Sequence, residues 1–240
     1  LCPLSADLFS SCCLGGQSRD MQNNKEKKNV FEIENLSFAY DKHEVLNNLN
    51  LSFHEGIVTT MIGPNGCGKS VFFKTLCGYS LLTEGQVIYR GKIIGKEQDF
   101  IDDAGIVIEE PEFINSLSGL ENLKILAEIQ KKISEAEIIE VLKQFDLYED
   151  RNKKVGKYSV GMKQKLRLAQ AVMEKPQVLI LDEPMNGLDK KSVKKVEDIL
   201  KAFVENGGTL LMTSHIEQQV EACCKIVYEI DGGEILRVTD

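Results

Sequence analysis

The order of apolar and polar positions along the chain predicts strands and helices in alternation. Two strands are expected first, at Val30 to Tyr40 and Val45 to Phe53. In the second of them Leu49, Leu51 and Phe53 alternate with polar residues, which indicates a strand with one buried face. Short apolar runs between turn residues predict further strands at 57–62, 84–89, 92–94, 106–108, 178–181, 209–213, 225–230 and 234–238.

Helical periodicity is concentrated in the middle of the chain. It predicts helices at Leu120 to Lys132, Ser134 to Leu147 and Val160 to Glu174, the last stopped by Pro176. The second of these begins with Ser134-Glu135-Ala136-Glu137, which has the residues of a capping box. Other helices are predicted to follow the glycine-rich segment near residue 68 and to span 190–205 and 216–224. This alternation implies a mostly parallel sheet covered on both faces, with residues 111–175 forming a helical insertion into the α/β core.

Length and composition limit the classes of protein that fit. A chain of 240 residues with 42% apolar residues suits one domain, or one domain with a small insertion. The net charge of −8 argues against a nucleic-acid partner, which requires a basic face. No apolar run approaches the roughly 20 residues that span a bilayer. The seven cysteines show no C-x-x-C spacing, which argues against a zinc site. Their odd number, and the presence of one of them in the glycine-rich segment near residue 68, suit a reducing compartment.

The first twenty residues differ from the rest of the chain. They do not begin with Met and lack the cationic start of a signal peptide, whereas Met21 begins a polar lead-in to the first strand. We therefore expect residues 1–20 to be an artificial or disordered extension and residues 21–240 to form a single domain.

The segment Gly63-Pro64-Asn65-Gly66-Cys67-Gly68-Lys69-Ser70 carries the most specific chemistry in the chain. It lies between a predicted strand and a predicted helix, which is the context in which G-x-x-x-x-G-K-S cradles phosphates through backbone N–H groups. Lys69 supplies a charge for the β- and γ-phosphates, and Ser70 supplies a hydroxyl for Mg²⁺. The segment predicts a nucleoside triphosphate site. Cys67 lies within the loop, and both a reactive thiol and an inert one remain open.

A second motif follows the predicted strand Val178 to Leu181. There the apolar run ends in Asp182-Glu183-Pro184, and the end of a buried strand beside a phosphate loop is where Mg²⁺ is held. Asp182 is the expected Mg²⁺ holder, and Glu183 is placed to accept a proton from the attacking water. Without the phosphate loop, a solvated strand end with two acidic residues would be the better interpretation.

From Val30 to Val238 the chain resembles the ATP-binding cassette (ABC) ATPases, the nucleotide-hydrolysing subunits of ABC transporters. Residues 63–70 match the Walker A loop, 178–184 Walker B, 158–164 the signature motif, 186–189 the D-loop and 213–215 the switch histidine. Tyr40 lies where the family places an aromatic side chain against adenine. The resemblance implies an α/β fold of the P-loop ABC ATPase type, with a mixed sheet core, an antiparallel β subdomain and a helical subdomain at about 111–175.

The resemblance also implies roles for particular residues. The catalytic group is Glu183, His215 and Lys69, and the metal-holding group is Ser70, Asp182 and Glu109. The expected cofactors are ATP and Mg²⁺. The residues expected to bind nucleotide are Tyr40, Gly63, Pro64, Asn65, Gly66, Cys67, Gly68, Lys69, Ser70, Val71, Glu109, Ser159, Gly161 and Asp189.

Three positions depart from the family pattern. Glu109 stands where the family usually has Gln, Met162 replaces the Gln of the signature motif, and Val71 stands where Thr or Ser is usual. The first two changes, together with Glu121-Asn122-Leu123, resemble the branch that serves exporters of the bacitracin or lantibiotic type.

The family implies an ATPase that works in a transporter. We expect a head-to-tail pair of cassettes, as a homodimer, which closes on two ATP molecules and reopens after hydrolysis. A separate transmembrane permease would hold this otherwise cytoplasmic subunit on the inner face of the cell membrane. Two alternatives stay open: an ABC ATPase that acts with soluble partners instead of a permease, and a regulatory cassette that binds ATP without turning it over.

Overall fold

The computed structural model describes residues 28–41, 43–109, 113–214 and 225–238. Its first strands form a four-stranded antiparallel sheet in the order β2-β1-β4-β5. The bounds of these strands are β1 (Asn29–Tyr40), β2 (His43–His54), β4 (Glu84–Tyr89) and β5 (Lys92–Ile93). The pairing of β1 with β2 and the short β4–β5 hairpin agree with the strands that the alternation of residues predicts.

A second sheet of six strands forms the centre of the molecule, in the order β10-β9-β3-β8-β7-β6. Its strands are β3 (Val58–Ile62), β6 (Ala104–Val107), β7 (Val178–Leu181), β8 (Thr209–Thr213), β9 (Ile226–Asp231) and β10 (Glu234–Arg237). All neighbours are parallel except β9 and β10, which are antiparallel. The prediction of a mixed sheet with an additional antiparallel sheet is therefore confirmed.

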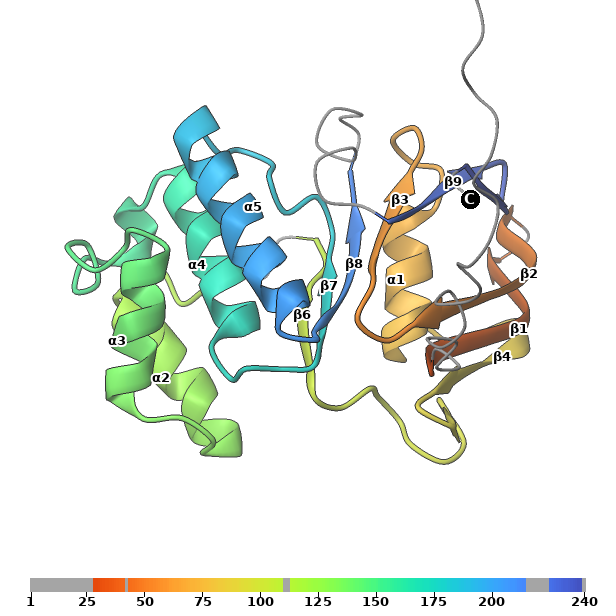
Figure 1. The fold of residues 1–240 in the computed structure, drawn as a ribbon, viewed down its shortest axis with the longest axis horizontal. Helices are drawn as coiled ribbons and strands as arrows, with labels where there is room; N and C mark the ends of the chain where they lie inside the picture. Colours follow the sequence, from red (N-terminus) through yellow and green to blue (C-terminus); the bar gives the residue numbers. More distant parts are fainter. Residues whose placement is uncertain (1–27, 42, 110–112, 215–224, 239–240) are drawn as a thin grey trace, which may run out of the picture.

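Helices cover both faces of the six-stranded sheet (Figure 1). Helix α1 (Lys69–Cys77) lies between the two sheets, and α4 (Val160–Val172) and α5 (Lys190–Glu205) lie on the other side. Helices α2 (Gly119–Gln130) and α3 (Glu135–Gln144) lie beyond α4, farthest from the antiparallel sheet. A short 3₁₀ helix, η1 (Val155–Lys157), leads into the segment before α4.

The predicted capping box at the start of α3 is present. The Ser134 side chain accepts a hydrogen bond from the Glu137 N–H, and the Glu137 carboxylate accepts one from the Ser134 N–H. Ser118 and Glu121 form a second capping box at the start of α2, which the sequence analysis did not identify.

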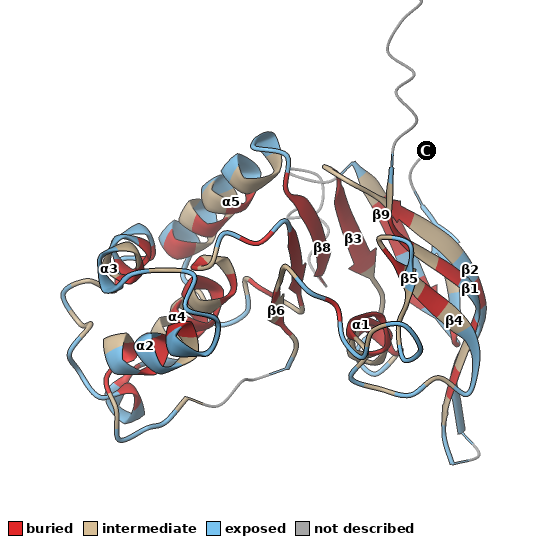
Figure 2. Ribbon diagram, turned by 90° about the horizontal axis from the view of Figure 1, so that it is seen from below, coloured by how far each residue is buried: buried red, intermediate tan, exposed pale blue. Residues whose placement is uncertain are grey.

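The six-stranded sheet separates two hydrophobic cores. Leu179 and Leu181 face the core shared with α2, α3, α4 and α5, whereas Val178 and Ile180 face the core shared with α1 and the antiparallel sheet. All four residues are fully buried, because successive side chains of a strand point to opposite faces and both faces are covered (Figure 2).

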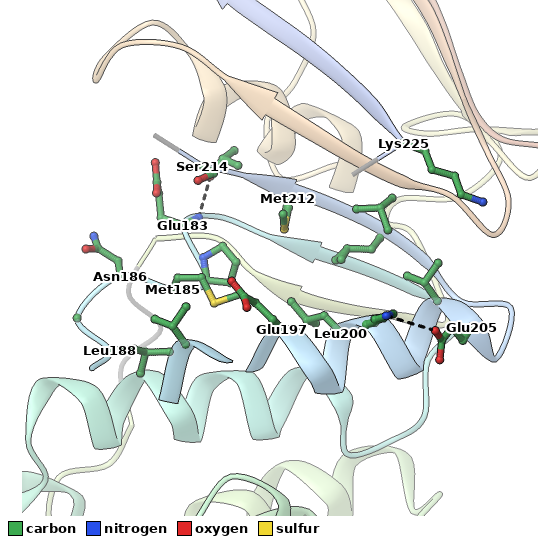
Figure 3. A pocket seen from close by; sticks show the side chains of 18 of the residues that line it. Glu183, Met185, Asn186, Leu188, Glu197, Leu200, Glu205, Met212, Ser214 and Lys225 are labelled. Carbon is green, nitrogen blue, oxygen red and sulfur yellow. Dashed lines mark hydrogen bonds and ion pairs between the residues drawn. The ribbon is translucent and has the colours of Figure 1, made fainter. Parts of the chain in front are cut away.

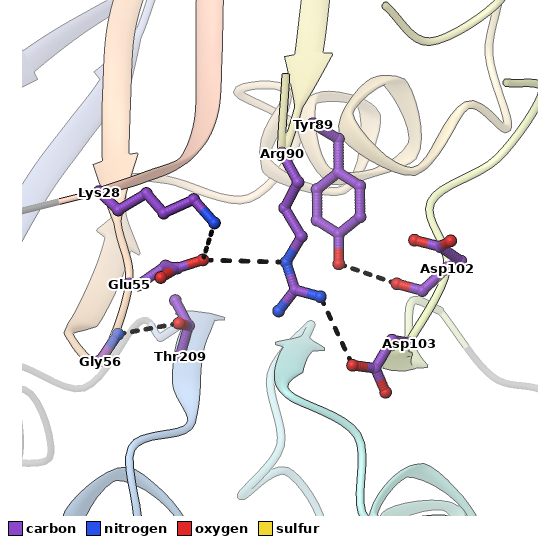
Figure 4. A network of polar contacts seen from close by, with 8 residues as sticks. All are labelled: Lys28, Glu55, Gly56, Tyr89, Arg90, Asp102, Asp103 and Thr209. Carbon is purple, nitrogen blue, oxygen red and sulfur yellow. Dashed lines mark hydrogen bonds and ion pairs between the residues drawn. The ribbon is translucent and has the colours of Figure 1, made fainter. Parts of the chain in front are cut away.

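Arg90 joins the two sheets at the edge where the parallel strands begin (Figure 4). Its guanidinium lies 4.0 Å from the Glu55 carboxylate, which precedes β3, and 3.5 Å from the Asp103 carboxylate, which precedes β6. The neighbouring Tyr89 hydroxyl donates a hydrogen bond of 2.8 Å to the Asp102 carbonyl. These contacts connect the amino ends of the strands, while the polar residues considered below follow their carboxyl ends.

The expected helix at 216–224 and the extension at 1–20 lie outside the described residues. Within the described part of the chain, every helix is too short or too polar to cross a membrane.

Candidate active site

The phosphate-loop segment connects β3 to α1 with a backbone that only glycine adopts easily. Gly63, Gly66 and Gly68 have φ angles of 147°, 82° and 109°. A Cβ on Gly63 would lie 2.3 Å from the carbonyl oxygen of Ile230 on β9, which leaves no room for a side chain. Backbone conformation thus favours glycine at all three positions, and at Gly63 the close packing against β9 requires it as well.

Lys69 lies across this loop. Its ammonium group donates hydrogen bonds to the carbonyl oxygens of Gly63 at 2.8 Å and Pro64 at 3.0 Å. The residue is 7% exposed. A cation held over the loop at the start of a helix is suited to binding phosphate oxygens.

The loop forms the floor of a pocket of about 730 Å³. The predicted residues that line it are Tyr40, Pro64, Asn65, Gly66, Cys67, Gly68, Lys69, Ser70, Val71, Asp182 and Glu183. Sequence reasoning missed other lining residues, namely His43, Glu44, Val45, Asp231, Gly232 and Gly233. The first three follow the β1–β2 turn and the last three form the β9–β10 turn, and only the folded chain brings these turns to the loop.

Hydrogen bonds link the Asp182 carboxylate and the Glu183 backbone to the neighbouring elements. The Ser70 hydroxyl donates to Asp182 Oδ2 at 2.5 Å, and the Thr213 hydroxyl donates to Asp182 Oδ1 at 2.6 Å. The same Thr213 oxygen accepts the N–H of Glu183 at 2.7 Å. Glu183 has a positive φ of 49°, an uncommon conformation for a residue with a side chain. Thr213 at the end of β8 therefore positions both Asp182 and Glu183, a role that its place in the sequence did not suggest.

Glu109 lies two residues beyond β6 and is not among the residues that line the pocket. Its carboxylate forms an ion pair with the ammonium of Lys74 on α1. Lys74 follows Ser70 by one helical turn, so both side chains lie on the same face of α1, toward the ends of β6 and β7. This i, i+4 spacing is the signal that could have identified Lys74 from the sequence.

The predicted residues of the signature motif are not among those that line the pocket. Ser159 caps α4, and its hydroxyl accepts the N–H of Met162 at 3.2 Å. Val160 is 68% exposed. Gly161 packs against the 186–189 loop so closely that an added Cβ at this position would lie 3.0 Å from the Gly187 carbonyl oxygen. The amino end of α4 is thus an exposed helix start, with Ser159 and Val160 at the surface.

Asp189 has a local structural role in this chain. It caps α5, accepting hydrogen bonds from the Ser192 N–H at 2.9 Å and from the Ser192 hydroxyl at 3.0 Å. These hydrogen bonds lower the pKa of Asp189 below its ordinary value. The carboxylate therefore remains ionised at the start of the helix.

The structure favours an inert Cys67. Burial raises the pKa of its thiol above the ordinary value, although Lys69 and backbone N–H groups act in the opposite direction. At neutral pH the thiolate fraction is consequently lower than in a free cysteine, which disfavours the reactive alternative.

Another pocket, of about 520 Å³, lies beside the turn that follows β7, between α5 and the six-stranded sheet (Figure 3). Glu183 is at one end, and Leu200 and Met212 line its apolar part. The predicted His215 follows Ser214 at the edge of this pocket and lies outside the described residues.

Comparison of the sequence with known proteins identifies the family of this chain. The sequence model of the ABC transporter family matches residues 46–186. The chain is 35% identical to the Bacillus subtilis protein named "Uncharacterized ABC transporter ATP-binding protein YybJ", over 86% of this chain and 94% of that protein. This chain belongs to the ABC transporter ATP-binding family.

Other similar proteins agree with this assignment. The lantibiotic transport ATP-binding protein SrtF of Streptococcus pyogenes is 34% identical over 86% of this chain and 89% of its own length. The bacitracin transport ATP-binding protein BcrA of Enterococcus faecalis is 33% identical over 86% of this chain and 68% of its own length. A solved ATP-binding subunit of an ABC transporter superposes with a TM-score of 0.78 at 24% identity, covering 87% of this chain and 90% of that one, and has the same fold.

The hydrogen bonds of Thr213 predict that this residue supports ATP turnover. Thr213→Val removes the donor to Asp182 and the acceptor of the Glu183 N–H, so we expect unfolding free energy to fall by about 1–3 kcal/mol. We expect turnover, measured as phosphate release, to fall about tenfold, which corresponds to an activation barrier raised by about 1.4 kcal/mol.

Thr209→Val is the matched control, since Thr209 lies at the other end of β8 and its hydroxyl accepts only the Gly56 N–H among the described contacts. It should lower stability by a similar amount and leave turnover within about twofold of the native value. Equal losses of turnover in both variants would contradict the special role of Thr213.

Proposed function

We propose that this chain binds and hydrolyses ATP as the motor subunit of an exporter. The observation that carries the proposal is the cluster at the carboxyl ends of β3, β7 and β8, where Lys69, Ser70, Asp182 and Glu183 gather around one pocket. In this proposal Lys69 and the loop N–H groups bind the phosphates, Tyr40 lies against adenine, and Glu183 accepts a proton from the attacking water. Tyr40 is 55% exposed at the mouth of the pocket, so its ring is accessible to a ligand.

The oxygen-rich surroundings of Ser70 fit Mg²⁺, which prefers oxygen ligands and keeps several of its waters. The Ser70 hydroxyl and the Asp182 carboxylate already touch, although no group of three or more His, Cys, Asp or Glu side chains that could hold a metal gathers among the described residues. Bound Mg²⁺ would neutralise charge on the transferred phosphoryl group. For Glu109 to contribute as expected, its carboxylate would have to leave Lys74.

If Glu109 must leave Lys74 before it can contribute to Mg²⁺ binding, then Lys74 opposes that contribution. Lys74→Met should lower the Mg²⁺ concentration for half-maximal binding of a fluorescent ATP analogue by about two- to fivefold, the scale of a partly exposed ion pair. Lys195→Met, which removes an ion pair with Asp146, serves as the control and should not change it. Persistence of the Lys74→Met effect in a Glu109→Gln background would show that it does not act through Glu109.

The exposed start of α4 supports a paired arrangement. Ser159 and Gly161 are not part of the nucleotide pocket of their own chain, so an anion bound at this helix start would belong to another nucleotide. We propose that two copies associate head to tail, each signature motif closing over the ATP of the other, and that hydrolysis reopens the pair.

Glu183→Gln tests this cycle. The variant should lose turnover by about 10²–10⁴-fold, because it lacks the general base, while it still binds ATP. With ATP present it should form a tighter dimer than the native chain, as measured by light scattering after size-exclusion chromatography. Glu197→Gln, on α5 in the neighbouring pocket, is the control and should behave as the native chain. An unchanged rate in Glu183→Gln would remove this residue from the mechanism.

The proposed partner in the membrane is a separate permease, and the named relatives favour a peptide antibiotic or drug as cargo. The segment beside α2 is a suitable docking surface. Asn122 binds both the N–H and the carbonyl of Ile114 with its side chain, at 2.8 and 3.2 Å, which holds the half-exposed Ile114 side chain outward.

Purification of this chain from the native membrane tests whether a permease binds to it. We expect a multi-span membrane protein to be retained with the native chain and lost with Ile114→Lys. The control Leu236→Lys changes another exposed apolar residue, on β10, and should retain the membrane protein. Retention of soluble partners alone would favour the alternative, an ABC ATPase that acts without a permease, and binding of ATP without turnover would favour a regulatory cassette.

A further inference from the structure

Gln164 connects the start of α4 to the turn that carries Glu183. It lies on the first turns of α4 and is 6% exposed. Its amide nitrogen donates to the carbonyl oxygens of Pro184 at 2.9 Å and Glu183 at 3.5 Å. Its amide oxygen accepts a hydrogen bond of 3.1 Å from the guanidinium of Arg167, which is 8% exposed.

The turn after β7 is consequently held from two sides. On one side the Thr213 hydroxyl accepts the Glu183 N–H at 2.7 Å. On the other side Gln164 donates to the Glu183 and Pro184 carbonyl oxygens, and the Asn186 N–H also donates to the Glu183 carbonyl at 3.1 Å. Because the Glu183 backbone has a positive φ, the direction of its side chain depends on these restraints.

Direct packing reinforces the connection. A Cβ on Gly187 would lie 2.8 Å from Val160 Cγ1, and a Cβ on Gly161 would lie 3.0 Å from the Gly187 carbonyl oxygen. Gln164 is five residues beyond Ser159, about 7.5 Å along the helix axis. A helix moves nearly as a rigid body over this length, so a displacement of α4 at Ser159 displaces Gln164 and, through it, the backbone of Glu183.

We propose that Gln164 is a positioning residue that couples the two ATP sites of the pair. An ATP bound by the partner copy is contacted by the Ser159 end of α4, while Glu183 acts on the ATP of its own chain. Gln164 lies between them and transmits the occupation of one site to the geometry of the other. This inference rests on the proposed function, because it requires the head-to-tail pair.

The coupling is tested by measuring ATP hydrolysis against ATP concentration, and ATP binding with a fluorescent analogue, on the full chain. The native chain should show a Hill coefficient above one. In Gln164→Leu we expect the Hill coefficient to fall to about one and kcat to fall about tenfold, with binding to the Walker A loop within about twofold of native.

Gln164→Glu provides the second variant. It keeps the size of the side chain and an acceptor for Arg167, but an ionised carboxylate cannot donate to the two carbonyl oxygens. Loss of cooperativity in this variant, with the same thermal unfolding midpoint as native, would assign the coupling to the donated hydrogen bonds. Gln170→Leu makes the same change on the same helix, away from the turn that carries Glu183, and should keep the native Hill coefficient.

Each result has a defined meaning. Native cooperativity in both Gln164 variants would overturn the role of Gln164 and leave the ATPase pair standing. A native chain that hydrolyses ATP without cooperativity would overturn the coupling itself. A native chain without ATP turnover would overturn the proposed function as well. A fall in unfolding midpoint with unchanged Hill coefficient would identify Gln164 as a structural residue only.

Discussion

The burial of β7 on both faces is the constraint on which the rest of the structure depends. Val178, Leu179, Ile180 and Leu181 have no exposed surface, since one core covers one side of the strand and a second core covers the other. The helices and the antiparallel sheet are therefore held together through this strand. Polar side chains fit only beyond the end of this buried strand, and the first two residues there are Asp182 and Glu183. The strand that holds the two cores together thus also positions the two acidic residues of the candidate site.

The polar contacts at that strand end come from several elements at once. Ser70 belongs to α1, Thr213 to β8 and Gln164 to α4, and each binds Asp182 or the backbone of the 183–184 turn. Buried polar groups require such partners, because an unmade hydrogen bond in this position costs about 1–3 kcal/mol. The same bonds that satisfy this requirement also orient the Asp182 carboxylate and hold the backbone that carries the Glu183 side chain. A displacement of any of these elements would consequently shift the position of Glu183.

The exposed parts of the molecule have the features expected of contacts with other proteins. The start of α4 presents Ser159 and Val160 outward, and Ile114 is held outward by Asn122. The nucleotide pocket itself is open and is lined on one side by turns from both sheets. These surfaces support the proposals of a paired cassette and of a permease partner, which depend on surfaces that a single chain leaves uncovered.

The order of residues along the chain was enough to predict the elements, the mixed sheet and the loop that cradles phosphate. Apolar periodicity reports which positions are buried, and the loop needs glycine at positions where φ is positive, so both are readable locally. The parts that Thr213, Gln164 and the β9–β10 turn take in the site were not identified, because nothing in their local sequence indicates their partners. The hydrogen bonds of the site join residues that are distant in the sequence: Gln164 is 19 positions from Glu183, Thr213 is 31 from Asp182, and Ser70 is 112 from Asp182. Such pairs arise only when the strands are placed side by side in the sheet, since hydrogen bonds require proximity in space and not along the chain.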